Sequence, residues 1–482
     1  MIRQQHLQLS LGGMLLLLLF QTHLFARSSA FKPIAQPLAS ASNVEELSDL
    51  IGEHPSLVPP IAWSFEREIA GVLTFSQTSQ FSGLVVINWG DNEVEAFQVN
   101  AGLNQTFVHD YDLSGLSGPF TVEVRACADD ITRITANFQE LIGVNVSGLS
   151  SLLRAYLNNN KINGTVDFGN CPNMELISLQ YNEDPVNANN INLIVNNTEN
   201  LQAYKAALGP DLILTTATSL KYVNIWSNQV QNFTLPTSAP DLKDLRFDAN
   251  QVDHDLDFSN FSDLETIKGQ GNDITEVNLS GLTKLKVVNL RGNRIRNDVD
   301  LSGSQDLNSV DVAYNQDSNV PGNLNLLIKD CKTIVAYKAA IAGTIDLKDA
   351  NSLEYFNIWA NQCTNVVMPN SPVNLTTFRA DANQLTNTLD FSACTSITNI
   401  KCDGNQLNQV ILPSLASSVL FTDLNLSSNQ LTNIDAIGTM VLTYTPTGGT
   451  ILLQGGGNAS LTQSIKDDLT INTTPPWVVQ SN

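Results

Sequence analysis

The sequence contains few histidines, and this scarcity limits the catalytic chemistry that it can support. Only five of its 482 residues are histidine, and those beyond the N-terminal leader described below are His54, His109 and His254. The chain also has no GxSxG, no HExxH and no glycine-rich phosphate loop, which are short motifs of hydrolases, zinc proteases and nucleotide-binding enzymes. We therefore expect no enzyme, no cofactor and no bound metal. The plentiful carboxylates leave a catalytic carboxylate pair, or calcium at Asp129 and Asp130, as open alternatives.

Basic residues are also scarce. The chain has 25 Lys and Arg against 47 Asp and Glu, which gives a formal net charge of -22. A chain this acidic is repelled by phosphate backbones and by anionic lipids. Its composition therefore argues against nucleic acid, or an anionic membrane surface, as the overall partner.

Long apolar runs are missing apart from one short segment near the N-terminus. The segment from Met14 to Phe20 is apolar, follows the basic Arg3 and precedes the small residues Ser28, Ser29 and Ala30. Such a run is too short to span a bilayer, and the three features together predict a secretory signal peptide over residues 1–30. We therefore expect no transmembrane segment, and a mature chain that is secreted and either extracellular or displayed at the cell surface.

One short motif, by contrast, is abundant. Segments such as LKYVNIWSNQV, LKDLRFDANQV and LKVVNLRGNRI fit L-x-x-L-x-L-x-x-N-x-L, the signature of a leucine-rich repeat. The apolar positions should point into a core, and the asparagine amide should satisfy backbone groups of neighbouring turns. The repeat asparagines are Asn160, Asn182, Asn228, Asn250, Asn272, Asn293, Asn315, Asn361, Asn383, Asn405 and Asn429. They predict a curved parallel β-solenoid of about 13 repeats over residues 129–439, followed by a C-terminal cap at residues 440–482.

A longer period indicates an internal duplication. The stretch AYKAALGPDLILTTATSLKYVNIWSNQ, beginning at Ala203, returns as AYKAAIAGTIDLKDANSLEYFNIWANQ, beginning at Ala336, a shift of 133 positions. Six repeats of about 22 residues fit this length. The chain therefore carries two copies of one surface, and these can be compared with each other.

The six cysteines of a secreted chain allow two interpretations. Four of them fall in the second copy of the duplication, and none has a cysteine at the equivalent position of the first. These four are Cys331, Cys363, Cys394 and Cys402, which correspond to Thr198, Val230, Phe261 and Gly269. Since no cysteine pair is repeated, we predict unpaired thiols that fill the core, with a disulfide framework as the alternative.

The N-terminal part of the mature chain has a different pattern. Residues 31–62 contain a Pro/Ala/Ser stretch, predicted to be a linker, and the segment NVEELSDLIGEH, which favours a short helix. Residues 63–128 alternate between apolar and polar residues in several short runs, which predicts a small antiparallel β-sandwich. The runs Trp89-Gly90-Asp91, His109-Asp110-Tyr111 and Gly118-Pro119-Phe120 resemble the motifs of the bacterial PKD domain, an immunoglobulin-like sandwich. In that family these residues hold a turn and a core corner and are not catalytic.

The whole arrangement resembles the secreted bacterial leucine-rich-repeat proteins that place a PKD-like domain before the repeats. Repeats such as NQLTNTLDFSACTSI match the form that those proteins often use, and the resemblance spans residues 80–480. It implies a mostly β chain, with a small antiparallel sandwich followed by a leucine-rich-repeat solenoid. For function it implies surface display, adhesion or ligand capture.

The outward-facing strand positions carry the residues that bear most directly on binding. With the repeat asparagine as position nine, position five shows Lys-Asn-Arg-Lys in both copies, and a Tyr/Trp pair flanks each asparagine. Aromatic rings beside amide and guanidinium donors are typical of carbohydrate sites and protein hot spots. The predicted ligand-binding residues are Lys205, Tyr222, Asn224, Trp226, Arg246, Lys268, Lys338, Tyr355, Asn357, Trp359, Arg379 and Lys401. The alternative is purely structural: the tryptophans cover apolar surface, and the arginines pair with Asp248 and Asp381.

The sequence therefore favours a monomeric binding or adhesion protein that holds an extracellular protein or glycan on its concave face. A structural spacer of an extracellular layer or matrix is the second interpretation, and a polymer-degrading enzyme is the third. Clustered aromatic and basic residues on one face favour binding, whereas featureless faces with repeated edge contacts would favour the spacer.

Overall fold

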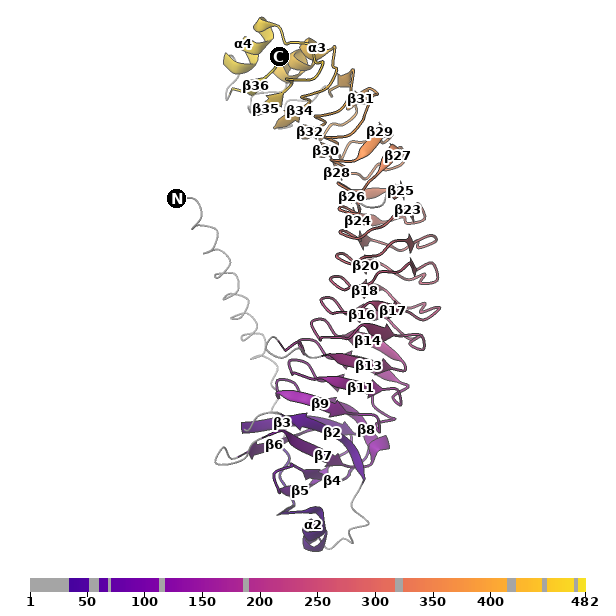
Figure 1. Ribbon diagram of the computed structural model, residues 1–482, viewed down its shortest axis with the longest axis vertical. Coiled ribbons are helices and arrows are strands. Elements are labelled where there is room, and N and C mark those ends of the chain that lie inside the picture. Colours follow the sequence, from indigo (N-terminus) through magenta and orange to yellow (C-terminus); the bar gives the residue numbers. More distant parts are fainter. Residues whose placement is uncertain are drawn as a thin grey trace. The chain divides into compact units, whose positions relative to one another are not determined.

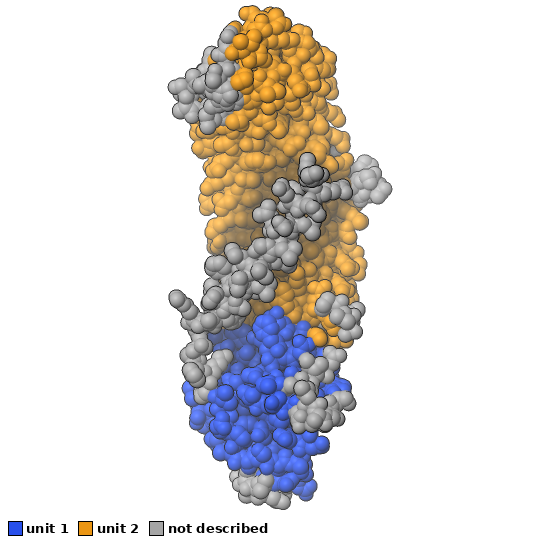
Figure 2. All heavy atoms as spheres, turned by 90° about the vertical axis from the view of Figure 1, so that its left-hand side faces the viewer, with its two compact units in different colours: residues 1–160 blue, residues 161–482 orange. Residues whose placement is uncertain are grey.

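The chain folds into two compact, β-rich units. The computed structural model describes residues 34–51, 60–67, 71–111, 118–184, 190–316, 324–413, 422–443, 449–471 and 476–482. These divide into unit 1, residues 1–160, and unit 2, residues 161–482 (Figure 2). Helix accounts for only 6% of the chain. The predicted signal peptide at residues 1–30 lies outside the described ranges, and within them no helix has the length and apolarity that crossing a bilayer would require.

The described residues of unit 1 form two β-sheets and one short α-helix. Its elements are β1 Ala39–Ala41, α2 Val44–Ile51, β2 Ile61–Arg67, β3 Gly71–Ser79, β4 Gly83–Asn88, β5 Val94–Val99, β6 Asn104–Tyr111, β7 Phe120–Arg125, η2 Ala128–Asp130, β8 Ile131–Thr135, β9 Leu141–Asn145 and β10 Arg154–Tyr156. One sheet is antiparallel, with the strand order β1-β5-β4-β7-β2-β9. In the other, β3 pairs antiparallel with β6 and β8, and β8 pairs parallel with β10.

The motif residues of unit 1 form a buried corner between strands. The indole of Trp89 is fully buried and stacks on the imidazole of His109, with ring centres 4.5 Å apart. His109 Nε2 lies 2.7 Å from Asp91 Oδ2, and the Tyr111 hydroxyl donates a hydrogen bond of 2.6 Å to the Trp89 carbonyl. The polar groups of Asp91, His109 and Tyr111 are thus used internally, as expected for a structural role.

Both sheets of unit 1 extend into the first repeat. β8 and β10 are repeat strands, and the sandwich strand β3 hydrogen-bonds along β8. On the other side of the same repeat, β9 pairs with β2. The first repeat strands are therefore covered by antiparallel neighbours, which removes a free sheet edge. The sequence-based boundary between residues 128 and 129 falls inside this unit, in η2.

Unit 2 is a leucine-rich-repeat solenoid, and the chain as a whole makes about twelve turns. Its long parallel sheet consists of β12 Met174–Ser178, β14 Thr198–Gln202, β16 Tyr222–Asn224, β18 Asp244–Arg246, β20 Thr266–Lys268, β22 Val287–Asn289, β24 Leu307–Asp311, β26 Cys331–Val335, β28 Tyr355–Asn357, β30 Thr377–Arg379, β32 Asn399–Lys401, β34 Asp423–Asn425, β35 Thr450–Leu452 and β36 Val478–Gln480. In Figure 1 the long sheet lines the inner side of this curved unit.

The back side of unit 2 consists of separate two-stranded parallel sheets, on the outer side of the curve (Figure 1). The pairs are β11 Gly164–Phe168 with β13 Ile191–Val195, β15 Asp211–Ile213 with β17 Asn232–Thr234, β19 Leu256–Asp257 with β21 Val277–Asn278, β23 Asn297–Leu301 with β25 Leu324–Ile328, β27 Ala342–Asp346 with β29 Gln362–Val367, and β31 Leu389–Asp390 with β33 Val410–Ile411. The back is therefore strand-like, because the connecting segments are too short for a helix in each repeat.

The core lies between the long sheet and the back side. The middle residue of each repeat strand points inward, and these residues stack in register from one turn to the next. Val223, Leu245 and Ile267, for example, are neighbours on successive strands and are each 0% exposed. Burial of one such side chain contributes about 1.5–3 kcal/mol. Because each turn contacts only its neighbours, the core lengthens with the number of repeats.

The repeat asparagines form a hydrogen-bonded ladder inside the solenoid. Asn250 is 8% exposed, and its Nδ2 donates to the carbonyls of Ile225 and Phe247, each at 2.9 Å. Its Oδ1 accepts from the Val230 amide at 3.1 Å. One side chain thus joins backbone groups of two successive turns. The ladder extends past the predicted end of the repeats to Asn458, whose amide makes the same kinds of contact.

The C-terminal segment continues the long sheet and adds two helices. β35 pairs with β34, and β36 pairs with β35, so strands of the sheet extend into the region predicted to be the cap. Helices α3 Ile434–Thr443 and α4 Gln463–Ile471 pack against each other. A side chain at Gly438 would meet Leu461 and Ile465 at under 3 Å, so this glycine permits the close approach of α3 to these residues.

Burial governs the chemistry of the cysteines. All six are unpaired in the structure, and Cys127 alone among them is exposed. Burial raises the pKa of Cys171, Cys331, Cys363 and Cys394 to about 12 and that of Cys402 well above its usual value. Thiols in such surroundings stay protonated and pack as small apolar groups.

Replacing Asn250 by Leu should lower the free energy of unfolding by about 1–3 kcal/mol, because four backbone partners would lose their hydrogen bonds to this side chain. The measurement is chemical denaturation followed by circular dichroism. Gln251→Leu is the matched control, since its side chain is exposed in the next position. Equal stability of the two variants would contradict the ladder.

Thiol titration should separate Cys127 from the other cysteines. At pH 8 a thiol reagent should modify Cys127 in the folded protein, although local desolvation and the neighbouring Asp130 raise the pKa of this thiol and slow the reaction. The reagent should reach the five buried thiols only after unfolding, because burial blocks access and disfavours the thiolate. Unfolded, unreduced protein should then give six free thiols by mass spectrometry. The detection of disulfides in that sample would overturn this account.

Candidate ligand-binding face

The predicted residues lie on the solvent-facing side of the long sheet, which we call the concave face. Side chains alternate along each three-residue strand, so that Leu245 is buried while Asp244 and Arg246 are partly exposed. The predicted strand residues are Tyr222 and Asn224 in β16, Arg246 in β18, Lys268 in β20, Tyr355 and Asn357 in β28, Arg379 in β30, and Lys401 in β32. Trp226 and Trp359 follow β16 and β28 by two residues.

Lys205 and Lys338 do not lie in the strand column, so their placement at position five is wrong. Strand β14 ends at Gln202, and it is Gln202 that pairs with Asn224; the second copy has the same register at β26. The two lysines lie in the following turns, with φ of 49° and 50°. The placement failed because Ala206, and its counterpart in the second copy, replaces the repeat asparagine that anchors the motif.

The two asparagines of the predicted site are buried and cannot face a ligand as exposed donors. Asn224 is 6% exposed and Asn357 is 5% exposed. Asn224 Nδ2 donates to the Tyr222 hydroxyl at 3.1 Å, and Asn357 Nδ2 donates to the Tyr355 hydroxyl at 3.2 Å. Each amide is therefore used to orient a tyrosine of its own strand.

An aromatic row crosses three consecutive turns in each copy. The first row is Tyr181, Tyr204 and Trp226, and the second row is Tyr314, Tyr337 and Trp359. In the first row the two tyrosines meet edge to face at 5.2 Å, and the second tyrosine stacks on the tryptophan at 5.5 Å with an interplanar angle of 6°. The corresponding distances in the second row are 5.1 and 5.3 Å. The turns hold the rings at stacking distance because neighbouring strands are about 4.8 Å apart.

Cationic side chains cover parts of both rows. Lys205 Nζ lies 5.2 Å from the ring centre of Trp226, and Lys338 Nζ lies 4.8 Å from that of Trp359. The guanidinium of Arg291 adds a contact to the second row, 4.7 Å from Tyr314. Each such contact contributes about 0.5–1 kcal/mol at an exposed site. The lysines are thus part of the candidate site, although they reach it from turns.

The two copies differ in the direction of one arginine. In the second copy, Arg379 Cζ lies 5.1 Å from the tryptophan ring, and the guanidinium pairs with Asp381 at 2.7 and 3.2 Å. At the equivalent position of the first copy, Arg246 pairs instead with Asp244, at 2.8 and 2.9 Å. Asp244 is specific to the first copy, because the second has Thr377 there.

Because of this difference, Asp248, the counterpart of Asp381, does not pair with Arg246. The structural alternative to a binding site predicts that pair from the sequence. Within the described ranges Asp248 makes no ion pair, and its Oδ2 accepts a 3.3 Å hydrogen bond from Gln270 Nε2. Burial raises the pKa of Asp248 above its ordinary value. The expected Arg379–Asp381 pair is present, whereas the expected Arg246–Asp248 pair is not formed.

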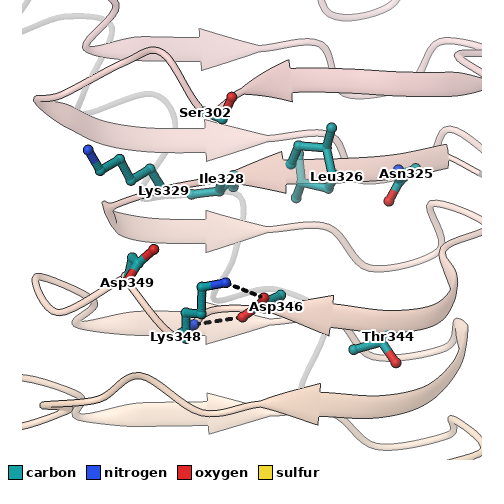
Figure 3. Close-up of a pocket in the computed structure, with 10 residues that line it drawn as sticks. Ser302, Asn325, Leu326, Ile328, Lys329, Thr344, Asp346, Lys348 and Asp349 are labelled. Carbon is teal, nitrogen blue, oxygen red and sulfur yellow. Dashed lines mark hydrogen bonds and ion pairs between the residues drawn. The ribbon is translucent and has the colours of Figure 1, made fainter.

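A hollow on the back side also recurs in both copies. One of 370 Å³ lies between β25 and β27, where Lys348 Nζ is 3.3 Å from Asp346 Oδ2 (Figure 3). Its counterpart of 280 Å³ lies between β13 and β15, with Ile213 and Thr215 at the equivalent positions. Each hollow forms where neighbouring strand pairs are not hydrogen-bonded to each other. The Lys348–Asp346 ion pair has no counterpart in the first copy. We therefore attribute the recurring hollow to the geometry of the repeats and not to a binding chemistry that the two copies share.

Sequence analysis missed several residues of the candidate site. The tyrosines of the two rows and Arg291 were not predicted, because most of them belong to turns and lie outside the strand column. A signal was present: the shift of 133 positions carries Tyr181 to Tyr314 and Tyr204 to Tyr337. Among the described residues, no three His, Cys, Asp or Glu side chains gather in a way that could hold a metal ion.

Asparagine substitutions at the two equivalent aspartates should have opposite effects on stability. The folded state raises the pKa of Asp248, so ionisation costs stability as the pH rises from about 4 to 7. Asp248→Asn should therefore unfold at a higher temperature than the parent at pH 7, and this gain should disappear near pH 3. Asp381→Asn should cost about 1 kcal/mol, because Arg379 loses its bidentate partner. Thermal denaturation across this pH range measures both, and shifts of the same sign would contradict the asymmetry.

Comparisons with known proteins give structural similarity alone. No family model and no curated protein matches the sequence. Among solved structures, the Arabidopsis receptor kinase HAESA in complex with the peptide hormone IDA and the co-receptor SERK1 is similar over 68% of this chain, at 20% identity and a TM-score of 0.45, and the chain spans only 55% of that protein's chain. An internalin (inlF) from Listeria monocytogenes is similar over 73% of this chain and 81% of its own, at 15% identity and a TM-score of 0.36. We draw neither a ligand nor an activity from these similarities.

Proposed function

We propose that this chain is a secreted or surface-displayed binding protein that holds an extracellular protein or glycan on its concave face. In this proposal the N-terminal sandwich is a PKD-like domain, and the protein acts as a monomer. The observation that carries the proposal is the pair of aromatic rows with their cations, which occur twice at equivalent positions of one face.

The composition of the rows supports contact with a ligand. Tyrosine, tryptophan and arginine are the residues that most often dominate binding energy, because they offer large contact areas with few rotatable bonds. Tyr181 and Tyr314, the terminal rings, are 44% and 42% exposed. Solvent-facing aromatic rings at the same place in two copies leave apolar area that a partner can cover.

The spacing of the two rows supports an extended ligand. Six repeats separate equivalent residues, which corresponds to roughly 30 Å at the spacing of neighbouring strands. A long polymer or an elongated protein could contact both rows at once. Two linked weak contacts would then give an affinity well beyond that of either row alone.

The second candidate function is a structural spacer. It is favoured by the contacts that the concave face makes with itself, since Arg379 pairs with Asp381 and both strand asparagines bond to their own tyrosines. A face satisfied in this way could simply stiffen the solenoid. Duplication would copy such stiffening contacts as faithfully as it copies a binding site. For the third interpretation, a polymer-degrading enzyme, no observation on the described residues gives support.

Removal of the tryptophans should test the proposal once an array of glycans and extracellular proteins has supplied a ligand. Trp226→Ala and Trp359→Ala should each weaken binding about tenfold or more, and the double variant should nearly abolish it. Ile213→Ala is the control, because it removes an exposed apolar side chain from the back side. A folded double variant that binds as well as the parent would leave the spacer as the better account.

A further inference from the structure

The second copy of the duplication displays how a guanidinium group sits on this face. Arg379, from strand β30, and Tyr337, from the turn after β26, both contact the ring of Trp359, which lies in the turn after the intervening strand β28. The same guanidinium makes two hydrogen bonds to the Asp381 carboxylate. Ring and carboxylate thus form a matched receptor for a flat, doubly donating cation.

The first copy retains the ring and the carboxylate of this receptor but turns its own arginine away. Trp226 and Asp248 occupy the equivalent positions, and Tyr204 again stacks on one side of the ring. Arg246 is held by two hydrogen bonds to Asp244. In the part of the chain that the structure describes, no cation lies on Trp226 from the β18 side.

Gln270 adds a third group to this place. Its Nε2 donates to Asp248 Oδ2, while its Oε1 is buried and makes no hydrogen bond in the structure. A buried acceptor without a donor is unfavourable, and a further N–H group from a ligand would satisfy it. We call Trp226, Asp248 and Gln270 together the cation seat.

We propose that the cation seat of the first copy binds an arginine side chain of a partner protein. The guanidinium would stack on Trp226, pair with the Asp248 carboxylate and donate a further N–H to Gln270 Oε1. Arginine fits better than lysine because its planar fork can stack and bind a carboxylate through two donors at once. This inference rests on the proposed function and narrows its ligand from any extracellular polymer to a protein with an exposed arginine.

The surrounding charges agree with a cationic ligand. The chain has a net charge of -22, so a basic partner is attracted to it over a long range. Three cations lie near the seat. Lys205 contacts Trp226 from the β14 side. Lys268 and Arg246 act on the Asp248 carboxylate through their charges, and neither forms an ion pair with it among the described residues. Among the described residues, Trp226 makes its ring contact with Tyr204 and its cation contact with Lys205, and neither of these comes from the β18 side.

The test uses a small probe and the indole N–H signals of the full mature chain. N-acetyl-arginine amide is titrated into protein labelled with ¹⁵N-tryptophan, and Trp226→Phe and Trp359→Phe identify the two relevant signals. The Trp226 signal should shift saturably, and the Trp359 signal should not, because Arg379 already covers that ring. N-acetyl-citrulline amide, which has the same shape without the charge, should cause no saturable shift.

Two variants should reverse which copy binds the arginine probe. Asp244→Thr removes the partner that holds Arg246, so the arginine should turn onto Trp226 and weaken probe binding at least tenfold. Arg379→Ala uncovers the second copy, so the Trp359 signal should now shift with the probe. Melting curves confirm that each variant is folded.

Several results would overturn the inference. They are equal responses of the two tryptophans in the parent, no response of either, equal binding of the citrulline probe, or unchanged binding in Asp244→Thr. Failure here is distinguishable from failure of the proposed function. A ligand that depends on Trp226 and Trp359 but competes with no arginine probe would keep the binding face and remove only the arginine, which would favour a glycan. A probe that binds the cation seat without displacing any array ligand would keep the arginine site and separate it from the ligand of the proposed function.

Discussion

The asparagine side chain inside each turn is the constraint on which the rest of the solenoid depends. A turn of about 22 residues cannot satisfy its own backbone groups, because its strands are short and its connections are irregular. The asparagine amide supplies the missing donors and acceptor, joining the carbonyls of two turns and an amide of the preceding connection. Where alanine replaces it, at Ala206 and Ala339, the next asparagine takes over, since Asn228 and Asn361 each accept two backbone amides there.

The regular ladder also determines what the concave face can do. Because successive strands stack in register, residues at one position of the repeat become neighbours at nearly constant distance. This explains why tyrosine and tryptophan from different turns stack at 5.5 and 5.3 Å in the two copies. It also explains how one substitution can separate the copies. An aspartate two residues before Arg246 offers a second possible bidentate partner beside Asp248, and the equivalent arginine lacks that choice.

Sequence reasoning predicted the fold well, because the repeat motif encodes both the inward positions and the turn. The mostly β solenoid and the small sandwich before it are confirmed. The prediction of the site was less complete, for physical reasons. Lys205 and Lys338 were placed by counting from an asparagine that those turns lack, and Asn224 was taken as exposed because strand alternation alone cannot show that a neighbouring tyrosine covers it. The aromatic rows were missed because turn residues meet only after the turns stack.

The central claim is that the concave face of unit 2, and not its back side, receives a ligand. Hydrogen–deuterium exchange of the protein, with and without a saturating array ligand, tests this claim most directly. The account predicts slower exchange in peptides that cover the face strands β14, β16, β18, β20, β26, β28, β30 and β32 and the turns that directly follow them. Exchange in the back strands β15, β17 and β29 should be unchanged. Protection confined to the back strands or to α3 and α4 would contradict it.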